Sequence, residues 1–430
     1  MKRTLMESLV AWKNKHERMP LILYGARQVG KTWLIKEFGA KNFDDTLYIN
    51  FEIDGALGMD FEASLDPARL INLLEAYSGR TIVADKTLIV FDEIQACPSA
   101  LTSLKYFREN APEYHIIAAG STLGVSVKSH ASSFPVGNVE LLTLLPLDFE
   151  EFLEALGQDL LIAAIREGFD ANRPLPESLH GKALDLYRSY LVVGGMPAAV
   201  NAYLREKKVM DSSLVQQTIL SAYTADMTKY AVPADTSKII TCYDSVPAQL
   251  AKENRKFQYK VVKKGGSATL FGAAIDWLAA SSLVEKCYRI EGAFMPLSAY
   301  RDLSAFKLYM NDVGLLTGKS GIPTSIMLSE HTGFTFLGAM AENYVAQALR
   351  AKGYSLYYWE SGGQAEVDFI LQKGEALIPV EVKAGEQTKS RSLSVYRERF
   401  KPELSIRISA RHFGFQDGLK SIPLYAAFCL

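Results

Sequence analysis

The chain has 430 residues, of which 48% are hydrophobic and 22% are charged, a composition typical of folded domains with buried cores. At roughly 100–200 residues per domain, this length predicts about two to four domains. The 47 Lys and Arg residues almost balance the 48 Asp and Glu residues, so any contact with nucleic acid would depend on a local basic patch.

The spacing of cysteine and histidine residues, together with the N-terminal sequence, excludes several further classes of protein. The six histidines show no HxH or HExxH spacing, and the four cysteines lie far apart without a CxxC pair: Cys97, Cys242, Cys287 and Cys429. Neither a disulfide framework nor a zinc or histidine-based metal site is therefore indicated. Residues 1–20 lack the apolar core of a secretion signal, and no run of about 18 apolar residues occurs, so we expect a cytoplasmic protein without a membrane contact.

The first motif is LYGARQVGKTWLIKEFG, residues 23–39, which contains the spacing GxxxxGK[ST]. An apolar run before it predicts a buried strand over residues 20–25, and a helix is expected after it, ending near Gly39. In this context backbone N–H groups can surround a phosphate, Lys31 can reach the outer phosphates, and the Thr32 hydroxyl can ligate Mg²⁺. The expected nucleotide-binding residues are Gly25, Ala26, Arg27, Gln28, Val29, Gly30, Lys31 and Thr32.

A second motif, KTLIVFDEI at residues 86–94, has four apolar residues before an acidic pair. This pattern predicts a strand buried on both faces, as in a parallel sheet, with Asp92 at its carboxyl end. We expect Asp92 to hold Mg²⁺ through a water, and Glu93 to orient or deprotonate the attacking water.

Three more strands are expected in the first third of the chain. They lie at residues 47–52, within 113–122, and at the start of 138–157, a stretch that continues into a helix capped at Asp148. Ser121 or Thr122, at the end of the second of these strands, could contact the γ-phosphate or the attacking water. Alternating strands and helices of this kind predict a doubly wound ATPase core.

These motifs resemble a family of bacterial and archaeal AAA-type ATPases of the STAND-like archaeal ATPase group. The resemblance begins with YGARQVGKT, FDEIQACPSALTSLKYFREN and IIAAGSTLGV, and continues through LPLDFEEFL, YLVVGGMPAAV, DMTKY, KLYMNDVGLL, AEVDFIL and IPVEVKAG, over nearly the whole chain. It implies ATP binding and a C-terminal domain of unknown function related to PD-(D/E)XK nucleases, and it leaves the cellular role open.

The predicted secondary structure of the middle of the chain changes near residue 236. Residues 150–235 are expected to be mainly helical, with a turn at GGMPAAV (194–200), and the resemblance makes them a lid-like region beside the nucleotide. A short helix within 244–254, a helix capped by Ser267 and a strand over 283–290 then predict a winged helix-turn-helix.

A basic run lies within this predicted winged helix. Six basic residues occur between positions 252 and 264, with one acid and two interleaved aromatic residues. Such a run can bind phosphates along double-stranded DNA, and the expected contacts are Lys256, Lys260, Lys263 and Lys264. A solvated loop surface would show the same pattern, and winged helices also bind proteins, so a protein partner stays open.

The last motif, AEVDFILQKGEALIPVEVKAG at residues 365–385, predicts two strands joined by a glycine turn. Side chains alternate along a strand, so Glu381 and Lys383 share a face, which Asp368 approaches if the strands pair. PD-(D/E)XK nucleases hold Mg²⁺ between two such carboxylates beside a lysine that orients the water or offsets developing charge. The resemblance adds Glu342, on a predicted helix, as a further metal ligand. An amphipathic hairpin with one polar face would give the same pattern.

We therefore expect an α/β multidomain protein. Its domains would be a P-loop AAA-type ATPase (1–150), a helical lid or connector (151–235), a winged helix (236–320) and a PD-(D/E)XK nuclease-like α/β domain (321–430). The favoured hypothesis is an ATP hydrolase that regulates its winged-helix and nuclease-like module, which acts on DNA or on a protein partner. An ATP-regulated, Mg-dependent DNA nuclease and a STAND-like signalling scaffold with an inactive nuclease fold are the alternatives. The oligomeric state, including a homo-oligomer, stays open.

Overall fold

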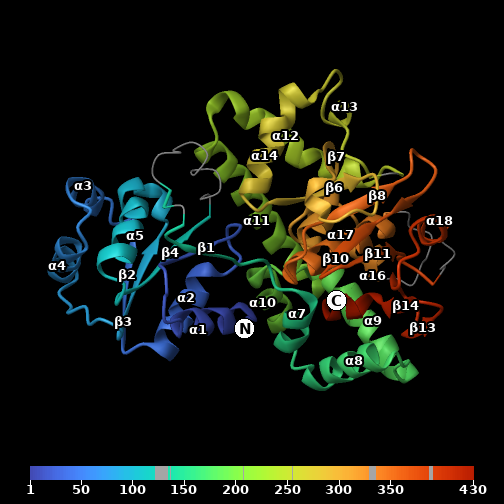
Figure 1. Ribbon diagram of the computed structural model, residues 1–430, viewed down its shortest axis with the longest axis horizontal. Coiled ribbons are helices and arrows are strands. Elements are labelled where there is room, and N and C mark those ends of the chain that lie inside the picture. The colour runs from blue at the N-terminus through green and yellow to red at the C-terminus, as the bar shows by residue number, and fades with distance from the viewer. Residues whose placement is uncertain (122–133, 136, 207, 254, 329–335, 387–390) are drawn as a thin grey trace. The chain divides into compact units, whose positions relative to one another are not determined.

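A computed structural model describes residues 1–121, 134–135, 137–206, 208–253, 255–328, 336–386 and 391–430 (Figure 1). The chain divides into two units. The N-terminal unit consists of Lys2–Leu145 with Ala280–Ser282, and the C-terminal unit consists of Met1, Pro146–Ala279 and Leu283–Leu430. No helix among the described residues is both long enough and apolar enough to cross a membrane.

The N-terminal unit is built on a five-stranded parallel sheet in the order β2-β3-β4-β1-β5. Every residue of the interior strands β3 and β4 is buried, as parallel sheets covered on both faces require. All five strands expected from apolar runs are confirmed, the second beginning two residues before its predicted start. They are β1 (Leu21–Tyr24), β2 (Asp45–Asn50), β3 (Thr87–Asp92), β4 (His115–Gly120) and β5 (Glu140–Thr143).

Helices cover both faces of this sheet (Figure 1). On one face lie α1 (Leu5–Lys13) and α2 (Lys31–Asn42). The other face packs against α3 (Leu57–Ala63), α4 (Pro67–Ser78) and α5 (Pro98–Asn110), and its core includes Phe51, Phe61 and Phe91. A short 3₁₀ helix, η1 (Ile94–Ala96), follows β3. The doubly wound core expected from the sequence is confirmed.

The C-terminal unit begins with the helical region expected after residue 150. Asp148 caps its first helix through a reciprocal pair of hydrogen bonds, in which the Glu151 amide donates to Asp148 Oδ1 at 2.8 Å and the Asp148 amide donates to Glu151 Oε2 at 3.3 Å. Gly194 turns the chain between the third and fourth helices, as expected. The helices are α7 (Phe149–Ala155), α8 (Asp159–Ala171), α9 (Glu177–Val193), α10 (Pro197–Glu206) and α11 (Val209–Tyr230).

Three helices and an antiparallel hairpin follow: α12 (Pro233–Leu250), α13 (Tyr259–Val262), α14 (Ala268–Ala280), β6 (Val284–Ile290) and β7 (Arg301–Met310). The first helix is longer than the short one expected, because Pro233, whose fixed φ favours the first helical turn, starts it eleven residues earlier. A 3₁₀ turn, η2 (Leu297–Ala299), lies within the hairpin. Strand β6 also pairs in parallel with β8 (Tyr357–Glu360), which pairs in turn with β9 (Glu366–Val367). The hairpin therefore belongs to a larger sheet, β7-β6-β8-β9, that the winged-helix prediction did not include.

The remaining residues form a second sheet, in the order β10-β11-β12-β14-β13. The predicted hairpin is confirmed as β10 (Phe369–Lys373) and β11 (Ala376–Val382), with Gly374 in the turn at φ 59°. Strands β11, β12 and β14 are parallel. The other elements are α15 (Val313–Ser320), α16 (Thr324–Leu328), α17 (Leu337–Ala351), β9 (Glu366–Val367), α18 (Arg391–Phe400), β12 (Ser405–Ser409), β13 (Gly414–Gln416), β14 (Leu419–Pro423) and η3 (Leu424–Cys429).

Candidate functional site

The loop between β1 and α2 has the backbone of a phosphate cradle. Gly25 has a φ of 146° and Gly30 a φ of 97°, values that side chains with a Cβ rarely adopt. A Cβ on Gly25 would also lie 2.2 Å from the Leu144 carbonyl oxygen. Helix α2 begins at Lys31 without a hydrogen bond from a capping side chain, so its first N–H groups face the loop. Such a helix start, preceded by a glycine loop, is suited to a bound phosphate.

Lys31 is the cation of this loop. Its side chain is buried, and its ammonium lies 2.9 Å from the carbonyl oxygens of both Gly25 and Ala26. These contacts hold the charge inside the curve of the loop, where a phosphate of the nucleotide would be expected.

Three donors converge on Asp92, at the end of β3. The Thr32 hydroxyl donates to Asp92 Oδ2 at 3.0 Å, the Tyr48 hydroxyl donates to the same oxygen, and the Glu93 amide donates to Asp92 Oδ1 at 2.9 Å. A hydroxyl oxygen and a carboxylate oxygen at this distance suit Mg²⁺, which prefers hard oxygen ligands. Thr32 and Asp92 are therefore the residues of this chain that would hold the ion.

Glu93 follows Asp92 with a left-handed backbone, at φ 49°, an uncommon conformation for a residue other than glycine. Burial raises the pKa of its carboxyl group above the ordinary value, and a hydrogen bond from the Gln95 amide opposes that shift. A partly buried carboxylate with a raised pKa beside Thr32 and Asp92 has the properties of a general base.

Ser121 directly follows β4, and this strand lies between β1 and β3 in the sheet. The sheet order therefore puts Ser121 at the same edge as the loop after β1 and the acidic pair after β3. Its alternative, Thr122, lies outside the described residues.

Sequence reasoning missed two residues of this site. Arg3 is buried and donates to the Val29 carbonyl at 2.9 Å and to the Leu145 carbonyl at 2.6 Å, so it ties the phosphate loop to the segment after β5. Tyr48 reaches Asp92 from the neighbouring strand β2. An expected parallel pairing of β2 with β3 could have suggested Tyr48, whereas the position of Arg3 in the sequence gives no such signal.

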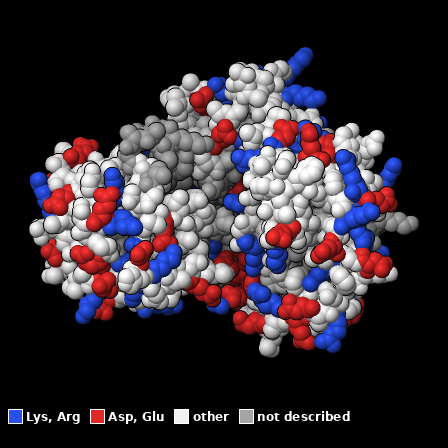
Figure 2. Space-filling model, viewed as in Figure 1, with Lys and Arg blue, Asp and Glu red and all other residues white. Residues whose placement is uncertain are grey.

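The predicted DNA-contacting residues are divided between two environments. Lys260, Lys263 and Lys264 are exposed around α13, and Figure 2 shows basic side chains projecting where Figure 1 places this helix. Lys256, in contrast, forms an ion pair with Glu360. Its neighbour Arg255 forms one with the buried Glu342. These two cations neutralise carboxylates of their own unit.

The predicted nuclease-like residues are close together, but they do not surround a position for a metal ion. Among the described residues, no group of three or more His, Cys, Asp or Glu side chains could hold one. Glu381 Oε1 accepts a hydrogen bond from Lys383 at 2.7 Å, and Asp368 Oδ2 accepts one from the Val382 amide at 2.8 Å. Lys307 lies 2.9 Å from Glu342 and 3.9 Å from Asp368.

The expectation of a metal held by Glu342, Asp368 and Glu381 is therefore not matched by the geometry. The physical reason is that the cation among these carboxylates is Lys307 of β7, a residue that the sequence analysis did not select. The residues present do not fit a divalent ion.

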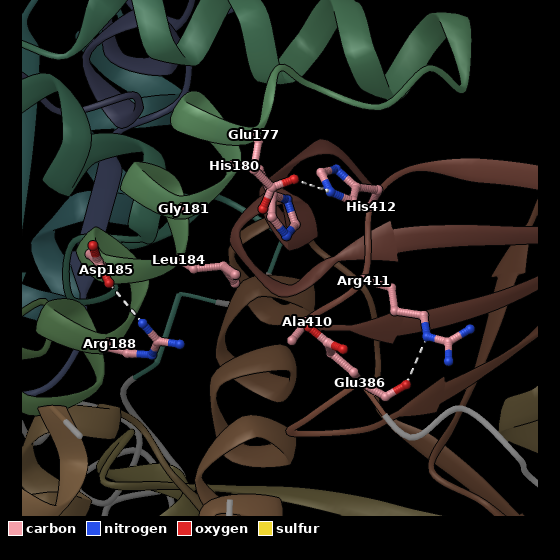
Figure 3. A pocket seen from close by; sticks show the side chains of 10 residues that line it. All are labelled: Glu177, His180, Gly181, Leu184, Asp185, Arg188, Glu386, Ala410, Arg411 and His412. Atoms are coloured by element: carbon pink, nitrogen blue, oxygen red, sulfur yellow. Dashed lines mark hydrogen bonds and ion pairs between the residues drawn. The ribbon is translucent and has the colours of Figure 1, made fainter. Parts of the chain in front are cut away.

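A separate cavity of about 490 Å³ lies between α9 and the residues that follow β11 and β12 (Figure 3). The His180 and His412 rings are stacked there, with centroids 3.7 Å apart. His180 Nδ1 is 2.9 Å from the Tyr425 hydroxyl, and His412 Nε2 is 3.1 Å from Glu177 Oε2. None of the sequence-predicted site residues lines this cavity.

Three family models match separate parts of the chain. Residues 17–153 match an AAA domain, residues 184–325 match a domain of unknown function (DUF8612), and residues 337–427 match another (DUF4143). No curated protein matches the chain.

Solved structures with some similarity include a Walker-type ATPase of Pyrococcus abyssi, at 14% identity and a TM-score of 0.46, covering 73% of this chain and 94% of that one. Another is the ORC1 protein of Aeropyrum pernix in complex with DNA, at 13% identity and a TM-score of 0.30, covering 76% and 92%. The AAA match agrees with the phosphate loop and the parallel sheet, so the N-terminal unit carries an AAA-type P-loop ATPase domain. The relation of the C-terminal residues to nucleases stays a prediction.

Proposed function

We propose that the protein is an ATP hydrolase whose AAA domain binds ATP with Mg²⁺ and thereby regulates the C-terminal unit. The observation that carries this proposal is the convergence of Thr32 and Asp92 at 3.0 Å, beside the buried Lys31 and the partly buried Glu93. These side chains supply a hydroxyl and a carboxylate for the ion, a cation for the phosphates and a base for water.

The roles follow from the chemistry of each side chain. Backbone amides of the loop and the Lys31 ammonium bind phosphate oxygens. A bound Mg²⁺ ion would polarise the phosphate being transferred. Glu93 accepts the proton of the attacking water, and its raised pKa makes it a stronger base than an exposed carboxylate. Ser121, at the end of the strand between the two motifs, orients the γ-phosphate or that water.

The test compares ATP binding with ATP hydrolysis in two variants. Glu93→Gln should still bind ATP but hydrolyse it about 10²–10⁴-fold more slowly, the range for a lost general base. Lys31→Ala should lose ATP binding, because each charge-assisted bond is worth roughly 1.5–3 kcal/mol. Glu109→Gln, which changes an exposed carboxylate of the same unit, is the matched control and should behave like the wild type. Hydrolysis at the wild-type rate by Glu93→Gln would remove Glu93 from its proposed role.

For the C-terminal unit we propose a winged helix-turn-helix that binds double-stranded DNA through α13 and its flanks. Support comes from the order α12, α13, α14 and the β6–β7 hairpin, and from the exposed Lys260, Lys263 and Lys264. Lys256 contributes less to the proposed DNA binding, because its ammonium is paired with Glu360.

Salt dependence tests this DNA contact. Replacing Lys260, Lys263 and Lys264 with Ala should reduce the slope of log K against log salt by about 0.9 for each phosphate that the protein no longer neutralises. A control variant replaces three exposed lysines elsewhere in the unit, Lys182, Lys373 and Lys401, and should keep the slope. If the first variant binds DNA with an unchanged slope, a protein partner becomes the better hypothesis, as in a signalling scaffold.

A further inference from the structure

A lysine lies fully buried among carboxylates in the C-terminal unit, where the nuclease resemblance led us to expect a metal ion. Lys307, on β7, has no exposed surface. Its ammonium lies 2.9 Å from Glu342 Oε1, 2.6 Å from Glu366 Oε1 and 3.9 Å from Asp368 Oδ1. A buried lysine is rare unless it is paired, and this one meets carboxylates from α17, from β9 and from the residue between β9 and β10.

Glu342 and Asp368 have further partners. Glu342 Oε2 pairs with the Arg255 guanidinium, and the Tyr309 hydroxyl donates to Glu342 Oε1. Asp368 Oδ2 accepts from the Val382 amide at 2.8 Å. The oxygens that Glu342 and Asp368 would offer to a metal are therefore already used by groups of the protein.

Lys383, the predicted catalytic lysine, is likewise committed to a carboxylate. Its ammonium lies 2.7 Å from Glu381 Oε1. This ion pair makes Lys383 a counter-ion of Glu381.

The backbone fixes Lys307 in this position. The residue lies in the middle of β7, opposite Cys287 of β6, and its neighbours Phe306 and Leu308 are buried. An incoming divalent ion would have to displace the ammonium, and a displaced ammonium would be buried without a partner, which costs several kcal/mol in proteins.

We infer that Lys307 takes the place of the divalent metal in this carboxylate cluster, which holds β7 to α17 and to the β9–β10 segment and binds no metal. According to this inference, the nuclease-like site is a buried charged cluster with a structural role. The inference does not depend on ATP hydrolysis, and it predicts that the purified protein does not cleave DNA with Mg²⁺ or Mn²⁺.

The first experiment measures Mn²⁺ binding by the full chain. An Asp92→Asn background removes a metal ligand of the nucleotide site, and nucleotide is left out. Electron paramagnetic resonance should then detect no stoichiometric Mn²⁺, and millimolar Mn²⁺ should not raise the melting temperature of the C-terminal unit. Binding of one Mn²⁺ that is lost on adding Asp368→Asn would overturn the inference.

The second experiment removes the lysine. Lys307→Met keeps most of the side-chain length but leaves the carboxylates unneutralised. The melting temperature of the C-terminal unit should therefore fall by several degrees or more, and Mn²⁺ should restore part of the loss. Adding Glu342→Gln and Glu366→Gln should raise the melting temperature again and abolish the effect of Mn²⁺.

A control variant, Lys319→Met, removes a lysine of the same unit whose partner, Asp244, is largely exposed, and should shift the melting temperature much less. A Lys307→Met protein as stable as the wild type would contradict the role of Lys307. Removal of a central counter-ion can prevent folding. If the Lys307→Met protein does not fold in any condition, the Mn²⁺ measurement on the Asp92→Asn protein tests the inference by itself.

Discussion

At the scale of single residues, the nucleotide site depends on how Asp92 is held. Thr32 and Glu93 lie within the two motifs, so the sequence could place both of them at the same site as Asp92. Tyr48 could have been suggested only by an expected pairing of β2 with β3, and Arg3 could not be predicted, because nothing in its local sequence indicates its contacts with distant residues. Lys307 escaped the sequence analysis for the same reason, since its partners lie 35 or more positions further along the chain.

Tyr48→Phe is the change that tests the support of Asp92. Burial and Asp92 both raise the pKa of the Tyr48 hydroxyl, so it stays protonated and donates to the carboxylate. A hydrogen bond to a charged group contributes roughly 1.5–3 kcal/mol, so we expect the affinity for Mg²⁺ in ATP hydrolysis to fall about tenfold or more.

The matched control for Tyr48 is Tyr77→Phe. The Tyr77 hydroxyl donates to Asp54 Oδ1 at 2.7 Å in the same unit, but this pair is exposed, so little change is expected. Titrating Mg²⁺ at saturating ATP gives the readout. Equal Mg²⁺ dependence in the two variants would mean that Asp92 is positioned without help from Tyr48.

At the scale of elements, strands with continuous apolar runs were predicted well because the runs are short and are bounded by residues typical of turns, which favours a buried strand over a helix. The same runs give no information about pairing between distant segments. The parallel contact of β6 with β8, which incorporates the predicted wing into a larger sheet, joins residues about 70 positions apart and could not be read from local spacing. The hairpin of β10 and β11 could, because a tight glycine turn links its strands.

Strand β4 provides a prediction on pH. His115 begins this strand among the rings of Trp12 and Phe43, with centroids 5.9 and 5.0 Å away. Burial, together with the nearby Arg18, lowers the pKa of His115 from 6.5 to about 4 against the effect of Asp85. The unfolded chain therefore takes up this proton first as the pH falls. The stability linked to His115 is complete above pH 6.5 and is lost between pH 6.5 and 4, by up to roughly 3 kcal/mol.

Urea unfolding at pH 7 and pH 5 measures this loss for the N-terminal unit, followed by fluorescence in a background where Trp33, Trp277 and Trp359 are replaced by Phe so that Trp12 alone reports. His115→Phe keeps a ring in the same position and should remove part of the dependence on pH. His16→Phe, which changes an exposed histidine of the same unit, should retain all of it. An identical loss of stability in the His115 variant and the wild type would assign the acid sensitivity to other groups.

At the scale of the whole molecule, the motifs GGMP and NDVGLL are explained by one contact within the C-terminal unit. Asp312, fully buried, accepts hydrogen bonds from the Gly195 amide at 2.6 Å and from the Leu315 amide at 2.9 Å. This contact joins the turn between α9 and α10 to the start of α15. The predicted divisions near residues 235 and 320 fall inside the same unit, which is held together by such buried polar contacts.

This contact leads to a prediction in which a substitution changes the stability of the C-terminal unit but not ATP binding by the N-terminal unit. Gly194 has a φ of 71°, and a Cβ there would lie 2.2 Å from Asp312 Oδ1. Gly194→Ala should therefore destabilise the C-terminal unit by about 1–3 kcal/mol, through backbone strain and the displaced carboxylate. The AAA domain does not include this turn, so the Kd for ATP should stay at the wild-type value.

Gly181→Ala is the control for this effect, because it adds the same methyl group to α9 at a position with no atom within 4 Å of the new Cβ. A glycine-to-alanine change inside a helix stabilises by roughly 0.5–1 kcal/mol, so the two variants should move stability in opposite directions. Urea unfolding gives the stability and equilibrium titration gives the Kd for ATP. If Gly194→Ala weakened ATP binding while Gly181→Ala did not, the turn would influence the nucleotide site, and the regulation that we propose would pass through the Asp312 contact.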